Sequence, residues 1–557
     1  MDVSGFLFSQ IGYDLKDPKR AIIRSNNRSY INTDTYFFII NLNNNNLVLK
    51  DKVNYWGEKW GSHWWEIDFS ALEAGKYKII VGDPDDPICK ADKIRVGENI
   101  LWDETIVKVG IEQLEKRAEL ARNKIGWMDA GMDWRESNSH STMIIGLTDI
   151  LANGLNMLSD KNWQRVAQQI VQGSDYLALS QDKAENIGFP EGSIIHEIPN
   201  HMQIIPGDQV KAAVALTRAS RYLTEIYPDK SAEYLERAVK LYDFILSELE
   251  PYGQSGFSHL NHGASEEFTV PDEFMTRDLV MMMWAGLELW ISGQLKYKKE
   301  VIRIAREIMN RQVEKENKEG KFYGHFYAFN NCNFTEKANT HHHIGHDTGS
   351  TFPHFIIPFI EIITRWYDHP DVDLWRKTVE DFAYGYFLPA CNQNPFYLLP
   401  EGYFKDQGLL NFCGPWHGIN TSIAFAATLA IKLEEFTGDS RFRQIAVGNI
   451  QWIAGLNSGI TGDSFENSCF VWNEDIESGK AEPYSQIYGI GRQYVECWTG
   501  VKGTITNGFS TNPQFKLVVE PTIENDRANL YTDEGWIPHA AGWISALSHL
   551  RHAKILS

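Results

Sequence analysis

The chain has 557 residues, of which 43% are hydrophobic and 23% charged, a composition typical of a folded globular protein with more than one domain. The formal net charge is −20, and no segment gathers Lys and Arg into a basic patch. These features exclude nucleic acids and anionic membranes as expected partners, because contacts with phosphate groups need clusters of positive charge.

The N-terminus reads MDVSGFLFSQIGYD, which has neither the basic start nor the long apolar run of a secretory leader. No stretch of about 18 uninterrupted apolar residues follows, so no membrane-spanning helix is predicted. The six cysteines show no CxxC pair and no disulfide-framework spacing, and we expect reduced thiols. These features predict a cytoplasmic protein, or a secreted one if a leader has been removed.

Residues 1–98 carry the pattern of β-strands. Short alternating runs such as RAIIRS, TYFFIINL, HWWEIDFS and GKYKIIVG are separated by clusters of Asn, Gly, Pro and Asp. Strands of this length and spacing predict a small β-sandwich. The asparagine-rich run NLNNNNLVLK is predicted to form the tip of a surface hairpin.

From about residue 101 the hydrophobic period becomes that of helices. Twelve amphipathic segments are predicted, at 103–122, 141–158, 160–180, 207–227, 230–249, 272–292, 296–313, 350–367, 370–388, 418–436, 439–455 and 537–553. Connections are short after most even-numbered segments and long before them. This alternation predicts six helical hairpins closed into an all-α (α/α)6 barrel over residues 99–557.

In such a barrel, every even-numbered helix starts at the same end, so the long loops before these helices converge on one face. Long loops in a compact domain are usually functional. These loops contain Asp129 and Asp133, HMQIIPGD (201–208), VPDEF (270–274), HHHIGHDTG (341–349), CGPWHGIN (413–420) and TDEGWIPHAAGW (532–543). Helix capping alone would also place Asp and Gly before helices, but the aromatic and polar content favours an open cleft for a hydroxyl-rich, chain-like ligand.

The first of these loops, GWMDAGMDWRESNSH, places Asp129 and Asp133 around a small Ala-Gly turn between Trp127 and Trp134. Like charges held close together raise the pKa of one of the two groups. The aspartates could form an Asx-turn and a helix N-cap. Alternatively, they could be a pair of carboxylates that activates a water molecule in a sugar-binding cleft.

Four stretches of the chain resemble the family 9 glycoside hydrolases. SQIGYDLKDPKRAII and HWWEIDFSALEAGKYKIIVG are similar to the N-terminal immunoglobulin-like module of that family. GWMDAGMDW resembles its aspartate motif, and DEGWIPHAAGWISAL resembles its C-terminal acidic motif. The resemblance extends in the right order from residue 5 to residue 550, and it implies an immunoglobulin-like sandwich followed by an (α/α)6 barrel.

The aspartate motif departs from the common cellulase form. Met132 is an additional residue, so that Asp129 and Asp133 are four apart rather than three. This spacing and the following Ser139-His140 are similar to a subgroup of exo-acting members that includes exo-β-glucosaminidases. The usual histidine-rich substrate motif is not evident in YSQIYGIGRQYVECW, which argues against a cellulase substrate more than against the chemistry.

Glycoside hydrolysis needs a protonated acid for the leaving oxygen and a carboxylate on the opposite face of the sugar. We expect Glu534 to be the acid, with burial and the neighbouring Asp533 raising its pKa. We expect Asp133 to be the base, with Asp129 holding the same water. The resemblance implies inversion, for which the acid and base lie about 6.5–9.5 Å apart.

The remaining predicted site residues are binding groups for the sugar. Aromatic rings stack on sugar faces, and polar side chains hydrogen-bond to hydroxyl groups. The candidates are Trp127, His140, His343, His346, Asp347, Trp416, His417, Arg492, Tyr494 and Trp536. The loop from His341 to Asp347 also has ligand types suited to a metal, but it lacks a specific motif, so no metal site and no required cofactor are predicted. The resemblance is compatible with a structural calcium.

Three other functions stay open at this stage. A secreted endo-β-1,4-glucanase would share the motifs. A phosphorylase or lyase on a similar barrel would need a phosphate pocket or a base suited to acidic sugars. A non-catalytic sugar-binding protein would have lost one of the three acidic residues Asp129, Asp133 and Glu534, all of which are present. The sequence therefore favours an inverting glycosidase acting on β-linked gluco- or glucosamino-oligosaccharides.

Overall fold

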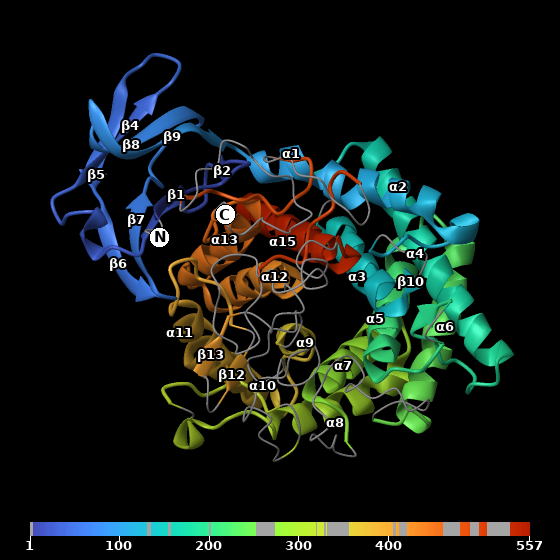
Figure 1. Ribbon diagram of the computed structural model, residues 1–557. Coiled ribbons are helices and arrows are strands. Elements are labelled where there is room, and N and C mark those ends of the chain that lie inside the picture. Colours follow the sequence, from blue (N-terminus) through green and yellow to red (C-terminus); the bar gives the residue numbers. More distant parts are fainter. Residues whose placement is uncertain are drawn as a thin grey trace.

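The computed structural model describes residues 4–130, 135–153, 157–199, 202–251, 273–318, 320–327, 330, 356–400, 402–404, 408–411, 420–459, 480–490, 501–509 and 535–556. The chain begins with a β-rich part whose last strand ends at Gly97, and helices follow from Ile100 onward. Figure 1 shows the strands on one side of the ring of helices. Within the described part of the chain, no helix is both long enough and apolar enough to cross a membrane.

The β-rich part is a sandwich of two sheets. Its strands are β1 (Ser4–Leu7), β2 (Tyr13–Asp14), β3 (Arg20–Ser25), β4 (Tyr36–Asn41), β5 (Leu47–Lys52), β6 (Asn54–Lys59), β7 (Ser62–Asp68), β8 (Gly75–Asp83) and β9 (Asp86–Gly97). One sheet has the order β14-β1-β3-β7-β6 and the other β2-β9-β8-β4-β5, where β14 (Lys480–Ala481) comes from the helical part. The asparagine-rich run connects β4 to β5, which confirms the predicted hairpin.

Two adjacent tryptophans on β7 show how the sandwich contacts the barrel. Successive side chains of a strand point to opposite faces. Trp65 therefore packs in the core of the sandwich, whereas Trp64 packs in the core of the helical part. The Trp64 ring meets Phe396 edge-on at 5.3 Å. The aromatic run HWWEIDFS thus joins the two cores rather than forming an exposed sugar-binding strip.

The predicted helical segments are present. The first combines α1 (Ile100–Val107), η2 (Lys108–Glu112) and α2 (Gln113–Leu120). The next are α3 (Ser137–Asn153), α4 (Asp160–Asn186), α5 (Pro206–Leu223), α6 (Pro228–Ser247), α7 (Thr276–Ile291), α8 (Lys298–Met309) and α9 (Ile357–Arg365). The last are α10 (Val372–Glu380), which continues into η7 (Asp381–Phe387) and α11 (Leu388–Cys391), and then α12 (Asn420–Thr437), α13 (Arg441–Ala454) and α15 (Ile537–Leu556).

These helices form two concentric layers. Helices α3, α5, α7, α9, α12 and α15 each contact the next one, and α15 contacts α3, so the inner ring is closed (Figure 1). The outer helices α4, α6, α8, α10 and α13 pack against their inner neighbours, and the first segment packs against α15. The predicted sandwich followed by an (α/α)6 barrel is confirmed.

Residue patterns explain the two layers. The outer helix α8 buries Val301, Ile304, Ala305 and Ile308, which have the i, i+3, i+4, i+7 spacing of a single apolar face. The inner helix α7 buries residues on all sides, including the run MMMW at 281–284, because neighbours surround it. Local signals fix the helix starts: the Ser159 hydroxyl caps α4, and proline begins α5 and α6.

Candidate active site

Asp129 lies in the loop that precedes α3, and it is completely buried. Its Oδ2 atom accepts a hydrogen bond from the Ser139 hydroxyl at 2.8 Å. The same oxygen accepts a second hydrogen bond from the indole Nε1 of Trp536 at 3.1 Å. Trp536 is half-buried and stands one residue before α15. The aspartate motif and the C-terminal acidic motif, about 400 residues apart in the chain, therefore meet at one carboxylate oxygen.

Arg117 on α2 connects the same two segments through their backbones. Its guanidinium donates to the carbonyl oxygens of Met128, at 3.0 Å, and Asp129. On the other side it donates to the carbonyl oxygen of Gly535 and, at 3.1 Å, to the Thr504 hydroxyl. The planar fork of an arginine suits such a bridge because its donors have fixed directions. Arg117 therefore holds the loop of Asp129 beside the residue that follows Glu534.

Trp127 and His140 support this loop from behind. The backbone N–H of Trp127 donates to His140 Nε2 at 2.9 Å, and His140 Nδ1 donates to the Glu136 carbonyl at 2.7 Å. The Trp127 indole donates to Gln169 at 2.9 Å. His140 also stacks on Tyr176 with ring centroids 3.9 Å apart.

Both Trp127 and His140 are completely buried, although contacts with substrate were predicted for them. Burial lowers the pKa of His140 to about 3, so the ring is neutral. Both of its nitrogens are engaged within the protein, which leaves them unavailable to a sugar hydroxyl. The sequence could not distinguish these roles, because a loop tryptophan can stack on a sugar or pack in a core.

A second polar group lies beside Ser139. Strands β10 (Arg135–Glu136) and β11 (Glu197–Ile198) are antiparallel, and their register places Glu136 directly opposite Glu197. The Ser139 hydroxyl is 3.1 Å from Glu136 Oε2. His196, next to Glu197, is 2.7 Å from Asp208 through its Nδ1 atom. We call Glu136, His196, Glu197 and Asp208 the acidic cluster.

The side chains of the acidic cluster shift one another's pKa values. Burial raises the pKa of Glu136, and the charges of Glu197 and Asp208 raise it further, while His196 acts in the opposite direction. Burial lowers the pKa of His196, but Asp208, Glu136 and Glu197 together outweigh burial and raise it to about 9. His196 is therefore a cation at neutral pH, and its charge balances part of the cluster.

The polar rim continues onto α7. Asp208 and Lys211 on α5 lie near Arg277 and Asp278 at the start of α7. Burial raises the pKa of Asp278 to about 6, against the opposing charges of Arg277 and Lys211. Burial lowers the pKa of Lys211 to about 8. The N-terminal ends of α3, α5 and α7 thus carry a continuous set of buried titratable groups, as expected for an active-site rim.

On the other side of Trp536, polar side chains fix the start of α15 against that of α12. His539 hydrogen-bonds through Nε2 to Asn507, and its Nδ1 accepts from the Thr421 hydroxyl at 2.7 Å. The Asn420 amide donates to Gln486 at 2.8 Å. These contacts place the starts of α12 and α15 side by side.

The chain offers one group of side chains close enough to hold a metal ion among the described residues. Ligand-type atoms of Glu136, His196 and Glu197 lie within 4.8 Å of one another. A histidine ligates a metal only in its neutral form. The raised pKa of His196 opposes this form and favours an imidazolium held by carboxylates.

Several predicted site residues lie outside the described residues. They are Asp133, Glu534, His343, His346, Asp347, Trp416, His417, Arg492 and Tyr494. Other polar groups near Asp129 were not predicted individually. They are Arg117, Asp208, Lys211, Asp278 and His539 on helices, Glu136 on β10 and His196 before β11, all at positions where a polar or charged residue is ordinary in sequence.

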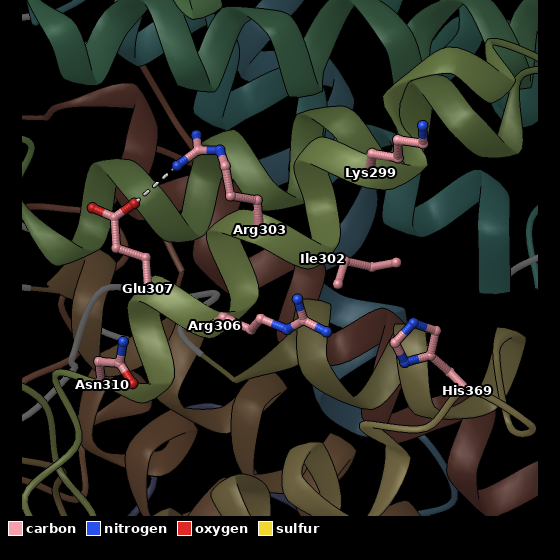
Figure 2. Close-up of a pocket in the computed structure, with 7 residues that line it drawn as sticks. All are labelled: Lys299, Ile302, Arg303, Arg306, Glu307, Asn310 and His369. Atoms are coloured by element: carbon pink, nitrogen blue, oxygen red, sulfur yellow. Dashed lines mark hydrogen bonds and ion pairs between the residues drawn. The ribbon is translucent and has the colours of Figure 1, made fainter.

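A groove of about 540 Å³ runs along the outer helix α8 and reaches His369 before α10 (Figure 2). Its two arginines are paired: Arg303 with Glu300 and Glu307, and Arg306 with Asp371. The groove lies on the outer layer of the barrel, and its lining includes none of the predicted site residues. The candidate active site is therefore the region around Asp129 and not this groove.

The N-terminal part of the chain matches a known protein family. The family described as the cellulase N-terminal Ig-like domain matches residues 5–85. The comparison with curated protein sequences gave no match.

Solved structures resemble the whole chain. A metagenome-derived glycoside hydrolase family 9 endoglucanase has a TM-score of 0.67 and 14% identity, with 98% of both chains covered. A Zn-binding triple mutant of the family 9 endoglucanase J30 has a TM-score of 0.63 and 12% identity, over 97% of this chain and 99% of that chain. AaCel9A in complex with cellobiose-like isofagomine has a TM-score of 0.59 and 12% identity, over 98% and 99%. The predicted resemblance to the family 9 glycoside hydrolases is confirmed as a shared fold.

Proposed function

We propose that this chain is an inverting glycoside hydrolase that cleaves β-linked gluco- or glucosamino-oligosaccharides. Glu534 is the general acid, Asp133 is the general base, and Asp129 holds the attacking water with Asp133. The observation that carries the proposal is the contact of Trp536 Nε1 with Asp129 Oδ2. It brings Asp129 of the aspartate motif to Trp536, which follows Glu534 by two residues in the sequence.

The chemistry starts from the surroundings of Asp129. Asp129 receives two hydrogen bonds on one oxygen, and donors of this kind stabilise the ionised form. An ionised Asp129 can hold one proton of a water molecule while Asp133 removes the other. Glu534 then protonates the leaving oxygen from the opposite side. Carboxyl groups and water suffice for this reaction, so no cofactor is proposed.

We assign the predicted binding residues to two roles. Trp127 and His140 are supporting groups that keep the Asp129 loop in place. Trp536 touches Asp129 and is half-buried, so its ring can form one wall of the subsite next to the scissile bond. The other proposed contacts with the sugar are those of His343, His346, Asp347, Trp416, His417, Arg492 and Tyr494.

The proposed substrate class is a short β-linked oligosaccharide. One relative with this fold was solved with cellobiose-like isofagomine, and others are described as endoglucanases. The four-residue spacing of Asp129 and Asp133 and the following Ser139-His140 favour exo action. An endo-β-1,4-glucanase is the second candidate, because the relatives carry that description.

Product analysis tests the proposal. Cellobiose, cellotriose, chitosan dimer and laminaribiose are incubated with the protein, with and without inorganic phosphate. We expect hydrolysis of at least one substrate, independent of phosphate and abolished in Glu534→Gln and Asp129→Asn. Glu119→Gln, an exposed acid on α2, is the matched control and should retain full turnover. Sugar phosphates as products would establish a phosphorylase, and turnover retained in Glu534→Gln would overturn the assignment of the acid.

A further inference from the structure

Asn138 is the second residue of α3 and directly precedes Ser139, whose hydroxyl contacts Asp129. An α-helix turns by about 100° per residue, so these two neighbouring side chains point in different directions. Ser139 faces the loop of Asp129, whereas the side chain of Asn138 reaches α5 and meets Lys211. The amide of Asn138 therefore lies beside the candidate active site, where α3 and α5 begin.

Lys211 determines the orientation of this amide. Its Nζ atom donates a hydrogen bond to Asn138 Oδ1 at 2.5 Å. A lysine ammonium group has donors and no acceptor, so the amide oxygen faces it and the amide nitrogen faces away. Burial lowers the pKa of Lys211 to about 8, which keeps the group mainly charged at neutral pH. Asn138 thus presents its two N–H donors on the side opposite to Lys211.

These two donors have no acceptor within the part of the chain that the structure describes. The Asn138 side chain makes its one contact there through Oδ1, with Lys211. The backbone carbonyl of Asn138 accepts from the Thr142 hydroxyl at 2.8 Å, which leaves the amide nitrogen out of both contacts. The side chain is half-buried, so a ligand can reach it. An amide held in one orientation with open donors is suited to bind an oxygen atom of a ligand.

Neighbouring polar groups lack one or other of these properties. His196 and Asp208 hydrogen-bond to each other at 2.7 Å, so their facing atoms are occupied. Asp278 is only 1% exposed, which leaves a ligand no access to its carboxyl group. Asn138, in contrast, is neutral, accessible and fixed by a partner that leaves its donors open.

We propose that Asn138 is a substrate-binding residue that donates to a hydroxyl oxygen of the sugar, and that Lys211 is the positioning residue that holds its amide in this orientation. The inference rests on the proposed function and narrows its substrate class. A hydroxyl oxygen has lone pairs that accept an N–H. The ammonium group of a glucosamine unit has none, and the charge of Lys211 repels it. The two residues therefore favour a neutral gluco unit over a protonated glucosamino unit at the position they contact.

Sugar binding to the Glu534→Gln variant tests the contact without turnover. The ligand is whichever of cellobiose, cellotriose and laminaribiose binds most tightly in calorimetry. Adding Asn138→Ala should raise its dissociation constant by about 5- to 10-fold, the loss expected for one hydrogen bond. Asn153→Ala is the matched control and should change nothing, since Asn153 is a half-buried asparagine at the opposite end of α3. Equal affinities with and without the Asn138 amide, or no binding of any of the three sugars, would overturn the inference.

Substitutions of Lys211 test the positioning in the same background. Lys211→Met cannot donate, so the amide can turn, and the affinity should fall about as far as in Asn138→Ala. Lys211→Arg should retain most of the affinity, because arginine also has donors and no acceptor. Combining Lys211→Met with Asn138→Ala should add no further loss, since Lys211 acts through Asn138. Additive losses would show that Lys211 has a separate role and would contradict its assignment.

Asn138→Asp tests the selectivity. It replaces the open N–H2 group by an acceptor oxygen, so binding of the protonated chitosan dimer should improve about tenfold relative to cellobiose. Asn153→Asp adds the same charge at the far end of α3 and should leave this ratio unchanged. An unchanged ratio in Asn138→Asp would contradict the inference. A protein that binds cellobiose through Asn138 but hydrolyses no substrate would refute the proposed function and leave the contact standing.

Discussion

At the scale of single residues, a few hydrogen-bond donors set the orientation of the Asp129 carboxylate. One carboxylate oxygen receives the Ser139 hydroxyl and the Trp536 indole, and the backbone of the same residue is held by Arg117. A hydrogen bond to a charged group contributes about 1.5–3 kcal/mol. The two side-chain donors are therefore sufficient to select one carboxylate orientation over the alternatives.

The Trp536→Phe substitution tests how much the indole N–H contributes to the orientation of Asp129. The substitution keeps an aromatic ring but removes the N–H that donates to Asp129, so kcat should fall by about 10- to 100-fold with little change in thermal stability. Trp543→Phe is the matched control. Its indole is buried on α15, which begins directly after Trp536, and donates to Thr105 at 2.9 Å. We expect that control to lower the melting temperature but to retain kcat; equal kcat in both variants would refute the role of Trp536.

Gly126 controls the position of the loop. Its φ of +71° favours glycine, and a Cβ atom there would lie 2.5 Å from His140 Nε2. Gly126→Ala should lower both stability and kcat, because His140 must move and the Trp127 hydrogen bond with it. Gly188→Ala is the control, since Gly188 has a φ of +94° and nothing within 4 Å of the added carbon. The control should cost about 1–2 kcal/mol in stability and no activity. Similar kcat losses in both would contradict this account of the loop.

At the scale of elements, the short β10–β11 pair concentrates charge. It joins the start of α3 to the loop before α5, and it brings His196 to Asp208. The pKa of His196, raised to about 9, means that the folded state binds its proton more tightly than the unfolded chain. The contribution to stability is complete below the unfolded pKa of about 6.5 and is lost as pH rises through 9.

The free energy of unfolding should therefore decrease by about 3 kcal/mol between pH 6.5 and pH 9 on account of His196. Urea unfolding at several pH values measures this slope. His196→Gln should flatten it, whereas His63→Gln on β7 of the sandwich should keep the wild-type slope. A wild-type slope of zero over this range, or one unaffected by His196→Gln, would exclude a protonated His196 in the folded state.

The elements also show what the sequence could and could not predict. The outer helices were predictable because their apolar residues follow one period, as Val301, Ile304, Ala305 and Ile308 do on α8. Asp129 was predictable because it belongs to a motif. Arg117 was not, since an arginine on an amphipathic helix usually faces solvent, and only the tertiary fold brings it to Gly535.

The acidic cluster was hidden for a related reason. Glu136 and Asp208 stand at helix starts, where an acid is expected from the helix dipole alone. Glu136 meets Glu197 through the register of a two-residue strand, which is too short to recognise in a sequence. Conversely, Trp127 and His140 resembled binding residues in the sequence, but burial depends on what packs around a loop.

At the scale of the whole molecule, the sandwich braces the barrel through buried ion pairs. Lys554 near the end of α15 lies 2.7 Å from Asp14 and 2.6 Å from Asp17 of the sandwich. Asp14 also accepts from the backbone of Leu101 at the start of α1. The helix that carries the C-terminal acidic motif at its start is thus anchored to the sandwich at its other end.

Lys554→Met should lower the free energy of unfolding by about 3–5 kcal/mol, because two buried carboxylates lose their partner. Differential scanning calorimetry measures the change. Lys116→Met is the control: its pairing with Glu119 is largely exposed, and the melting temperature should not change. If Lys554→Met melts like the wild type, the ion pairs do not contribute to joining the two parts.

The central claim is that Asp129 and Asp133 hold water for a direct displacement, with Glu534 as the acid. Proton NMR of the first products from a β-linked substrate tests it most directly, with the wild type beside Glu534→Gln. We predict initial release of the α-anomer by the wild type and none by the variant. Initial release of the β-anomer would contradict the account, because retention requires a carboxylate that attacks the sugar itself instead of activating water.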